Sequence, residues 1–285
     1  MTASITRHPV LTYFVLAFAL SWGALLTVVG PGGFNGTTEP TNAQLPFVFL
    51  AMFAGPTFAG ILLTGLVHGT AGYRELRSRL LLWRVGARWY AVAVLAAPFL
   101  MIVTLFALSL RNPVFIPGIF ASEGRASLLL TSMVAGLVTG FCEELGWTGF
   151  AVPRLRLRGG VLATGLIVGV LWGAWHFPLF SSGDPSGAVP PLIFVPGLLF
   201  TVLPAYRVLM VWVYDRTGSL LVAMLMHASF TTSTLILQPV AIAGVPAMTY
   251  NLVVAAVLCV VIAAVAMANR GRLSRQPLRG RAAGK

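Results

Sequence analysis

The chain has 285 residues, of which 58% are hydrophobic and only 9% are charged. Soluble domains usually carry roughly a quarter charged residues, so this composition excludes an ordinary water-soluble globule. The formal net charge is +12, but the Arg residues stand between long apolar runs. Nucleic-acid binding needs basic patches on a polar surface, so we expect no nucleic-acid partner and a membrane protein instead.

Eight apolar segments are long enough to cross a bilayer, which takes roughly 20 residues for ~30 Å of hydrocarbon. We therefore predict an all-α membrane protein, a bundle of about eight transmembrane helices in a single domain over residues 1–285. The first segment is too long for a signal peptide and is interpreted as the first span. The predicted spans are 9–29, 45–67, 89–110, 127–150, 161–180, 191–213, 219–237 and 247–268.

The basic residues are distributed unevenly between the connecting segments. Sixteen of the 19 Lys and Arg residues fall on the side that carries both termini. Because cytoplasmic loops carry the excess of positive charge, we expect both termini to be cytoplasmic. The same rule predicts a basic cytoplasmic tail at 269–285 and an Arg-rich loop at 68–88 that faces anionic lipid. The segments on this side are 1–8, 68–88, 151–160, 214–218 and 269–285.

Ionisable residues inside the predicted spans mark the candidate site, because burying them in a bilayer is costly. Of the seven Asp and Glu residues, Glu143 and Glu144 alone lie inside a span, and His176, His227 and Arg207 lie inside spans five to seven. At about 1.5 Å of rise per residue, Glu143, His227 and Arg207 lie roughly 9–12 Å above the inner ends of their spans. His176 is discordant, since the same count puts it about 22 Å up.

These residue types favour hydrolysis over a purely structural role. Adjacent buried glutamates must share a proton or find cations, although a lone buried histidine often does no more than hydrogen-bond a neighbouring helix. A carboxylate suits a general base that takes a proton from water, and neutral imidazole suits water positioning or a divalent metal. The HExxH, GxSG and GxGD signatures of other membrane proteases are absent from the sequence.

Three motifs resemble those of a known family. Residues 143–148 read EELGWT and run on into Gly-Phe, residues 172–176 read WGAWH, and residues 227–231 read HASFT. They resemble the EExxxR, FxxxH and HxxxN motifs of the CPBP intramembrane endopeptidases, also described as Abi or CAAX-protease-like. The likeness covers residues 127–237, the expected catalytic core, and the family's eukaryotic branch also has eight spans with cytoplasmic termini.

The resemblance implies a role for each motif residue. Glu143 would be the general base, with Glu144 supporting it, and His176 would hold or polarise the water. His227 would stabilise the oxyanion, and Trp172 would be the aromatic residue of the second motif. The family is generally described as metalloproteases, although a metal-free Glu/His-activated water is also argued. If a divalent metal is bound, Zn²⁺ first of all, His176 and His227 would be its ligands together with a carboxylate.

Two positions depart from the family's pattern. Thr148 stands where the first motif has Arg, and Thr231 stands where the third has Asn. The hydroxyl of Thr231 can still donate one hydrogen bond. Two interpretations of Arg207 are open: it supplies the missing cation to Glu143 or Glu144, or it snorkels to the inner headgroups.

We therefore expect an intramembrane endopeptidase that hydrolyses a peptide bond near the cytoplasmic face, in a bilayer that is a bacterial cell membrane. Its substrate would be a peptide or a membrane protein. The two departures favour an alternative, an inactive family member that acts as a membrane scaffold or bacteriocin-immunity factor. A transporter or proton channel is a third interpretation, because intramembrane Glu and His suit it equally.

Overall fold

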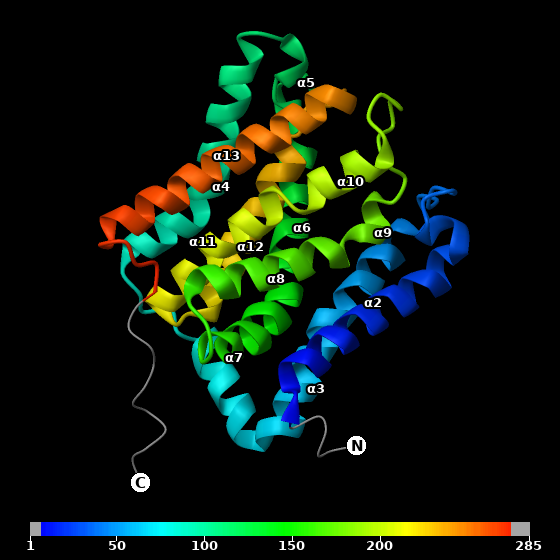
Figure 1. Ribbon diagram of the computed structural model, residues 1–285. Helices are drawn as coiled ribbons and strands as arrows, with labels where there is room; N and C mark the ends of the chain where they lie inside the picture. Colours follow the sequence, from blue (N-terminus) through cyan, green and yellow to red (C-terminus); the bar gives the residue numbers. More distant parts are fainter. Residues whose placement is uncertain (1–6, 275–285) are drawn as a thin grey trace.

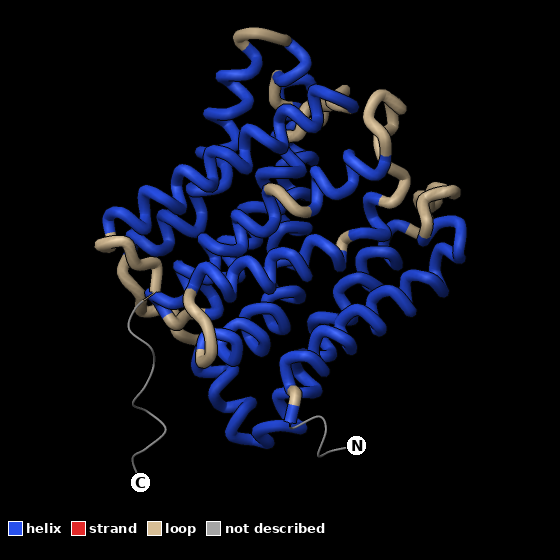
Figure 2. The backbone as a smooth tube through the Cα atoms, in the orientation of Figure 1, coloured by secondary structure: helices blue, strands red, loops and turns tan. Residues whose placement is uncertain are grey.

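A computed structural model describes residues 7–274, and this part of the chain forms helices and loops without any strand. The helices run side by side in one bundle, with the loops gathered at their ends (Figures 1 and 2). The helices are α2 (Pro9–Phe34), α3 (Leu45–Leu80), α4 (Ala87–Ser109), η1 (Pro113–Phe115), α5 (Gly118–Ala121), α6 (Arg125–Gly146), η2 (Trp147–Ala151), α7 (Val152–Arg156), α8 (Val161–Trp175), α9 (Phe177–Phe180), α10 (Pro191–Leu199), α11 (Val202–Thr217), α12 (Leu220–Leu237) and α13 (Gly244–Ala268).

The predicted all-α membrane fold is confirmed. Among residues 7–274, seven helical segments are long and apolar enough to span a bilayer, and α8 is a shorter apolar helix at the place of the fifth predicted span. The sixth span consists of α10 and α11, which are interrupted at Phe200 and Thr201. The side on which the termini lie stays a prediction, and the tail beyond residue 274 lies outside the described residues.

α3 is longer than the sequence predicts. The apolar run ends near residue 67, but the helix continues to Leu80 after a sharp change of direction at Gly69, where φ is +59°. Glycine adopts this left-handed conformation without steric cost, so the chain can turn there and resume as a helix. The second piece, residues 70–80, carries three of the five Arg residues of the predicted basic loop, Arg74, Arg77 and Arg79.

Small residues let the helices that carry the candidate site approach closely. A Cβ atom on Gly140 of α6 would lie 2.5 Å from the carbonyl oxygen of Met224 on α12. A Cβ atom on Gly169 of α8 would lie 2.5 Å from Cα of Pro204 on α11. Small residues at helix crossings are typical of membrane bundles, where backbone approach replaces the hydrophobic effect as the source of packing energy. These two contacts hold α6 against α12 and α8 against α11.

Large apolar side chains cover the outside of the bundle. Examples are Phe99 and Phe106 of α4 and Leu130 and Leu137 of α6, all more than half exposed. A soluble monomer rarely exposes apolar surface on this scale, whereas a lipid-facing surface requires it. The helices and their surface therefore indicate an integral membrane protein.

Candidate active site

The ionisable residues singled out in the spans meet inside the bundle. Glu143 and Glu144 lie at the end of α6, Arg207 lies on α11 and His227 lies on α12, and each side chain is at most 2% exposed. Their polar atoms are joined by hydrogen bonds and by the indole N–H of Trp172 from α8. Four helices thus contribute to one buried polar cluster.

Glu144 is surrounded by donors. Nη1 of Arg207 lies 2.8 Å from Oε1 and 2.9 Å from Oε2 of this carboxylate. Nδ1 of His227 lies 2.7 Å from Oε1, and the hydroxyl of Thr148 donates to Oε2. A carboxylate held by a buried guanidinium and two further donors is stabilised as the anion and has little capacity left for a substrate.

Glu143 has a different environment. Its Oε2 accepts from the indole N–H of Trp172 at 2.8 Å and from that of Trp147 at 3.3 Å. Nε2 of His227 lies 3.9 Å from the same oxygen, which is too long for a direct hydrogen bond. Within the described residues no hydrogen bond reaches Oε1 of Glu143, and this residue lines a cavity.

The contact with Glu144 fixes the tautomer of His227. A carboxylate oxygen accepts hydrogen bonds, so Nδ1 of His227 must carry the proton that Glu144 receives. In the neutral ring Nε2 is then the acceptor, and it faces the cavity next to Glu143. This is the orienting role that a second carboxylate commonly has for a functional histidine.

His176 joins the site despite the depth expected from its sequence position. It follows the last residue of α8, its Nδ1 lies 2.8 Å from the carbonyl oxygen of Trp172, and it lines the same cavity as Glu143 and His227. Because a carbonyl only accepts, Nδ1 carries the proton and Nε2 is an acceptor in the neutral ring. α8 is inclined to α6 (Figure 1), so counting the rise along each helix as if they were parallel overestimated the separation.

A π-helical turn forms part of the first motif. η2 (Trp147–Ala151) directly follows α6, and its first two residues reach back four positions, Trp147 to Glu143 and Thr148 to Glu144. Such turns occur often at functional sites. The sequence analysis did not identify Trp147 as a site residue; an indole one turn after a buried glutamate was the available signal.

Arg207 pairs with Glu144, so of its two interpretations the pairing is confirmed. The side chain is fully buried, and its guanidinium carbon lies 4.2 Å from the ring centroid of Trp172. It therefore supplies, from another helix, the cation that Thr148 cannot supply from the first motif. Trp172 contacts both halves of the cluster, with its ring against Arg207 and its N–H on Glu143.

A cavity of about 500 Å³ extends from the cluster. Glu143, His176, His227 and Thr231 line it, and most of the remaining lining is apolar. It reaches the loop residues Gly183, Pro185 and Gln238, which lie at the far end of the bundle from α7. This volume and this mixture of apolar wall and a few polar groups are typical of a small-molecule or peptide site.

The expected metal ligands are not gathered into a cluster. Among residues 7–274, no group of three His, Cys, Asp or Glu side chains is placed to hold a metal ion. Nδ1 of His227 is already engaged by Glu144. The residues as arranged do not fit a three-ligand site, so the divalent metal stays a prediction and no step below uses it.

The segment that contains the polar cluster is similar to a known protein family. Residues 125–233 match the family model described as type II CAAX prenyl endopeptidase Rce1-like. The matched segment contains the polar cluster. All of Glu143, Glu144, Trp172, His176 and His227 fall within it. This confirms the resemblance to the CAAX-protease-like family seen in the three motifs.

A curated relative supports the same conclusion over a shorter stretch. The chain is 43% identical over 37 residues to a protein named CAAX prenyl protease 2 from Methanococcus maripaludis. That match covers 13% of this chain and 14% of the relative's length.

Proposed function

We propose that the protein is an intramembrane endopeptidase that hydrolyses a peptide bond with a water molecule activated by Glu143. The observation that carries this proposal is the contrast between the two glutamates. Glu144 is held by Arg207, Thr148 and His227, whereas Glu143 has a carboxylate oxygen without a donor and lies against a cavity. A base that must accept a proton needs such a free oxygen.

The attacking water would bind between Glu143 and His227. Nε2 of His227 lies 3.9 Å from Oε2 of Glu143, so the two side chains adjoin each other. A water molecule beside them has two protons and can donate one to Nε2 of His227 and the other to Oε1, the oxygen of Glu143 without a donor. His176 lines the same cavity, and its Nε2 would accept a hydrogen bond from the substrate rather than from this water, whose two protons are already donated.

The reaction then follows from these positions. The water oxygen attacks the carbonyl carbon of the scissile bond while its proton passes to Glu143. The oxyanion of the tetrahedral intermediate accepts a hydrogen bond from the hydroxyl of Thr231, which lines the cavity one turn beyond His227. Collapse breaks the C–N bond, and Glu143 returns the proton to the departing amine.

The substrate would be a peptide or a membrane protein that reaches the site along the apolar cavity. Exposed apolar side chains at its rim, such as Phe49 and Leu235, favour a chain that arrives from the bilayer. We propose cleavage toward the cytoplasmic side, because Glu143 and His227 lie nearer the Arg-rich ends of their spans; the cavity itself extends from them to the loop 181–190 on the other side.

Replacement of Glu143 by Gln tests the proposal. Glu143→Gln keeps the size and the acceptor for the indole N–H groups but cannot take a proton, so the cleavage rate should fall about 10²–10⁴-fold. The measurement compares membrane proteomes, and then the purified protein in bilayers, for wild type and variant. Glu123→Gln is the matched control, because Glu123 is exposed in the loop before α6.

The outcomes separate an enzyme from a scaffold. Unchanged cleavage in Glu143→Gln, with the thermal midpoint of wild type, would remove Glu143 as the base. Full biological activity in a Glu143→Gln/His176→Gln double variant would favour the scaffold or immunity factor.

A further inference from the structure

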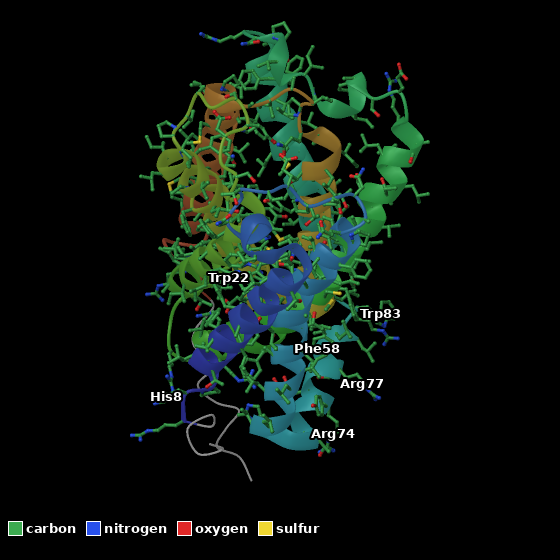
Figure 3. The ribbon with its side chains drawn as sticks, turned by 90° about the vertical axis from the view of Figure 1, so that its right-hand side faces the viewer. His8, Trp22, Phe58, Arg74, Arg77 and Trp83 are labelled. Carbon is green, nitrogen blue, oxygen red and sulfur yellow. The ribbon has the colours of Figure 1, made fainter. Side chains whose placement is uncertain are left out.

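The second piece of α3 carries a charged surface that the proposed reaction does not use. After the turn at Gly69, the side chains of Arg74 and Arg77 are exposed on one edge of the molecule, with Trp83 near them (Figure 3). Glu75 is the one acidic residue in residues 70–88, and Arg79 lies 3.6 Å from it. The surface is therefore strongly basic.

Apolar side chains alternate with these charges. Leu81 and Trp83 are each 60% exposed, and the guanidinium carbon of Arg84 lies 5.0 Å from the Trp83 ring centroid. Trp residues are enriched at the level of the lipid headgroups, where an apolar ring and a polar neighbour are both accommodated. A site for a soluble anion would not need exposed Leu and Trp beside its Arg residues.

We propose that residues 70–88 bind the phosphate groups of anionic phospholipids. We further propose that this binding stabilises η2 and the first turn of α12, which support the candidate active site. The positive charge of this surface complements the negative charge of lipid headgroups, and Arg and phosphate form bidentate hydrogen bonds. The part that concerns the site rests on the proposed function; the binding part does not.

The first link to the site runs through Arg79. Its side chain is 15% exposed, and it donates to the carbonyl oxygen of Gly149 at 2.9 Å and to the hydroxyl of Tyr214 at 2.8 Å. Gly149 belongs to η2, the turn that supplies the Trp147 and Thr148 contacts to the two glutamates. The segment that meets the headgroups thus holds the turn that positions both carboxylates.

The second link runs to the helix that carries His227. The hydroxyl of Ser219 donates to the carbonyl oxygen of Leu82 at 2.7 Å and accepts from the backbone N–H of Val222. Ser219 is the N-cap of α12, so residues 70–88 contact the first turn of that helix. Leu76 also packs with Leu220 in a small apolar cluster.

The first experiment measures lipid binding. The full-length protein is placed in phosphatidylcholine bilayers with increasing mole fractions of brominated phosphatidylglycerol, and quenching is assigned to Trp83 by difference from Trp83→Phe. Arg74→Gln/Arg77→Gln should weaken the apparent affinity about 25-fold, from about fivefold for each Arg near the surface. The matched control is Arg111→Gln/Arg125→Gln, which should leave the affinity unchanged. Arg111 lies in the loop after α4 and Arg125 is the first residue of α6, both at the other end of the bundle.

Two results would overturn the binding proposal. One is equal weakening in both double variants. The other is competition by soluble glycerol phosphate at concentrations comparable to the lipid in detergent, which would indicate a site for a free anion.

The second experiment separates binding from its effect on the site. Phosphatidylglycerol should slow hydrogen–deuterium exchange at the backbone amides of η2 in wild type, because a turn that is held more firmly opens less often. Arg79→Gln should keep the lipid affinity, because Arg79 is mostly buried, but lose this slowing; Arg79→Lys should restore part of it. A slowing that persists in Arg79→Gln would contradict the link to η2. Because neither readout needs cleavage, a failure of the proposed function remains distinguishable.

Discussion

The polar cluster has two halves that differ in how many donors their carboxylate oxygens have. The enclosed half consists of Glu144, Arg207 and Thr148, with Nδ1 of His227. The cavity half consists of Glu143 and His176, with Nε2 of the same His227. In the first half every carboxylate oxygen has a donor, whereas in the second Nε2 of each histidine and Oε1 of Glu143 have no donor within the described residues. The enclosed half holds the Glu144 carboxylate in place, and the cavity half has acceptors available for a reaction.

Helix geometry explains how neighbouring residues reach such different surroundings. Successive residues on an α-helix are rotated by about 100°, so Glu143 and Glu144 project toward different partners. His227 lies between them, with one ring nitrogen on each side. The comparison predicts that damage to the enclosed half lowers stability, while damage to the cavity half lowers activity.

Removal of the buried cation should have the largest effect on stability. Arg207→Met leaves the Glu144 carboxylate in the core without its guanidinium, and breaking a buried pair in this way costs about 3–5 kcal/mol. The thermal midpoint of the purified protein measures the loss. Arg207→Lys, which keeps the charge but not the stacking on Trp172, should fall between wild type and Arg207→Met.

A double-mutant cycle checks that the effect belongs to the pair. Glu144→Gln/Arg207→Met removes both charges, and it should be more stable than Arg207→Met alone because no unpaired ion remains. If the losses of stability in Glu144→Gln and Arg207→Met simply add in the double variant, the two residues do not act as a unit and the comparison of the two halves fails.

Removal of one indole N–H should have a smaller effect, and on activity. Trp172→Phe keeps an aromatic ring beside Arg207 but removes the 2.8 Å hydrogen bond to Glu143. Hydrogen bonds to charged groups contribute about 1.5–3 kcal/mol, so kcat should fall at least about tenfold while KM changes little.

The neighbouring indole provides the control for this variant. Nε1 of Trp175 is buried without a hydrogen-bond partner in the described part of the chain. Trp175→Phe therefore removes an N–H that holds nothing, and its kcat should stay near that of wild type. Equal losses in the two variants would mean that ring packing, and not the N–H, matters at residue 172.

The spans were predictable because bilayer thickness fixes the length of an apolar run. The same rule fails where polar residues continue a helix, and so the extension of α3 past Gly69 was not predicted. The break between α10 and α11 was also missed, because residues 191–206 contain no charge and no signal strong enough to place it. Proline at 196 and 204 removes backbone donors on either side of that break.

The residues of the site were predictable, but the different partners of Glu143 and Glu144 were not. Scarcity of charge in the spans pointed to Glu143, Glu144, Arg207 and the two histidines, and depth alone suggested the Arg207 pairing. Which glutamate Arg207 contacts depends on helix rotation, which hydropathy does not report. The inclination of α8 likewise determines where His176 lies, and it follows from packing against α11 rather than from the sequence of α8.

The rim of the cavity half offers the smallest predicted effect. The Asp184 carboxylate accepts from the backbone N–H groups of Ser186, Val189 and Gly244, the last at 2.8 Å, and from the Ser186 hydroxyl. It thereby ties the loop at 181–190 to the start of α13, and both line the cavity. Desolvation alone would raise the pKa of Asp184, but these hydrogen bonds lower it to about 2.

The lowered pKa gives Asp184 a defined pH window. Its ordinary value is about 3.9, so the folded state gains stability from the carboxylate above pH ~4, and this gain is lost as the pH falls toward 2. Asp184→Asn should lower the thermal midpoint slightly at pH 7, and the difference from wild type should shrink as the pH is reduced through this window. Glu39→Gln, in an exposed loop, should show no such difference. A gap between wild type and Asp184→Asn that stays constant down to pH 2 would mean that the charge of Asp184 does not hold the rim, and that the cavity half owes its shape to apolar packing alone.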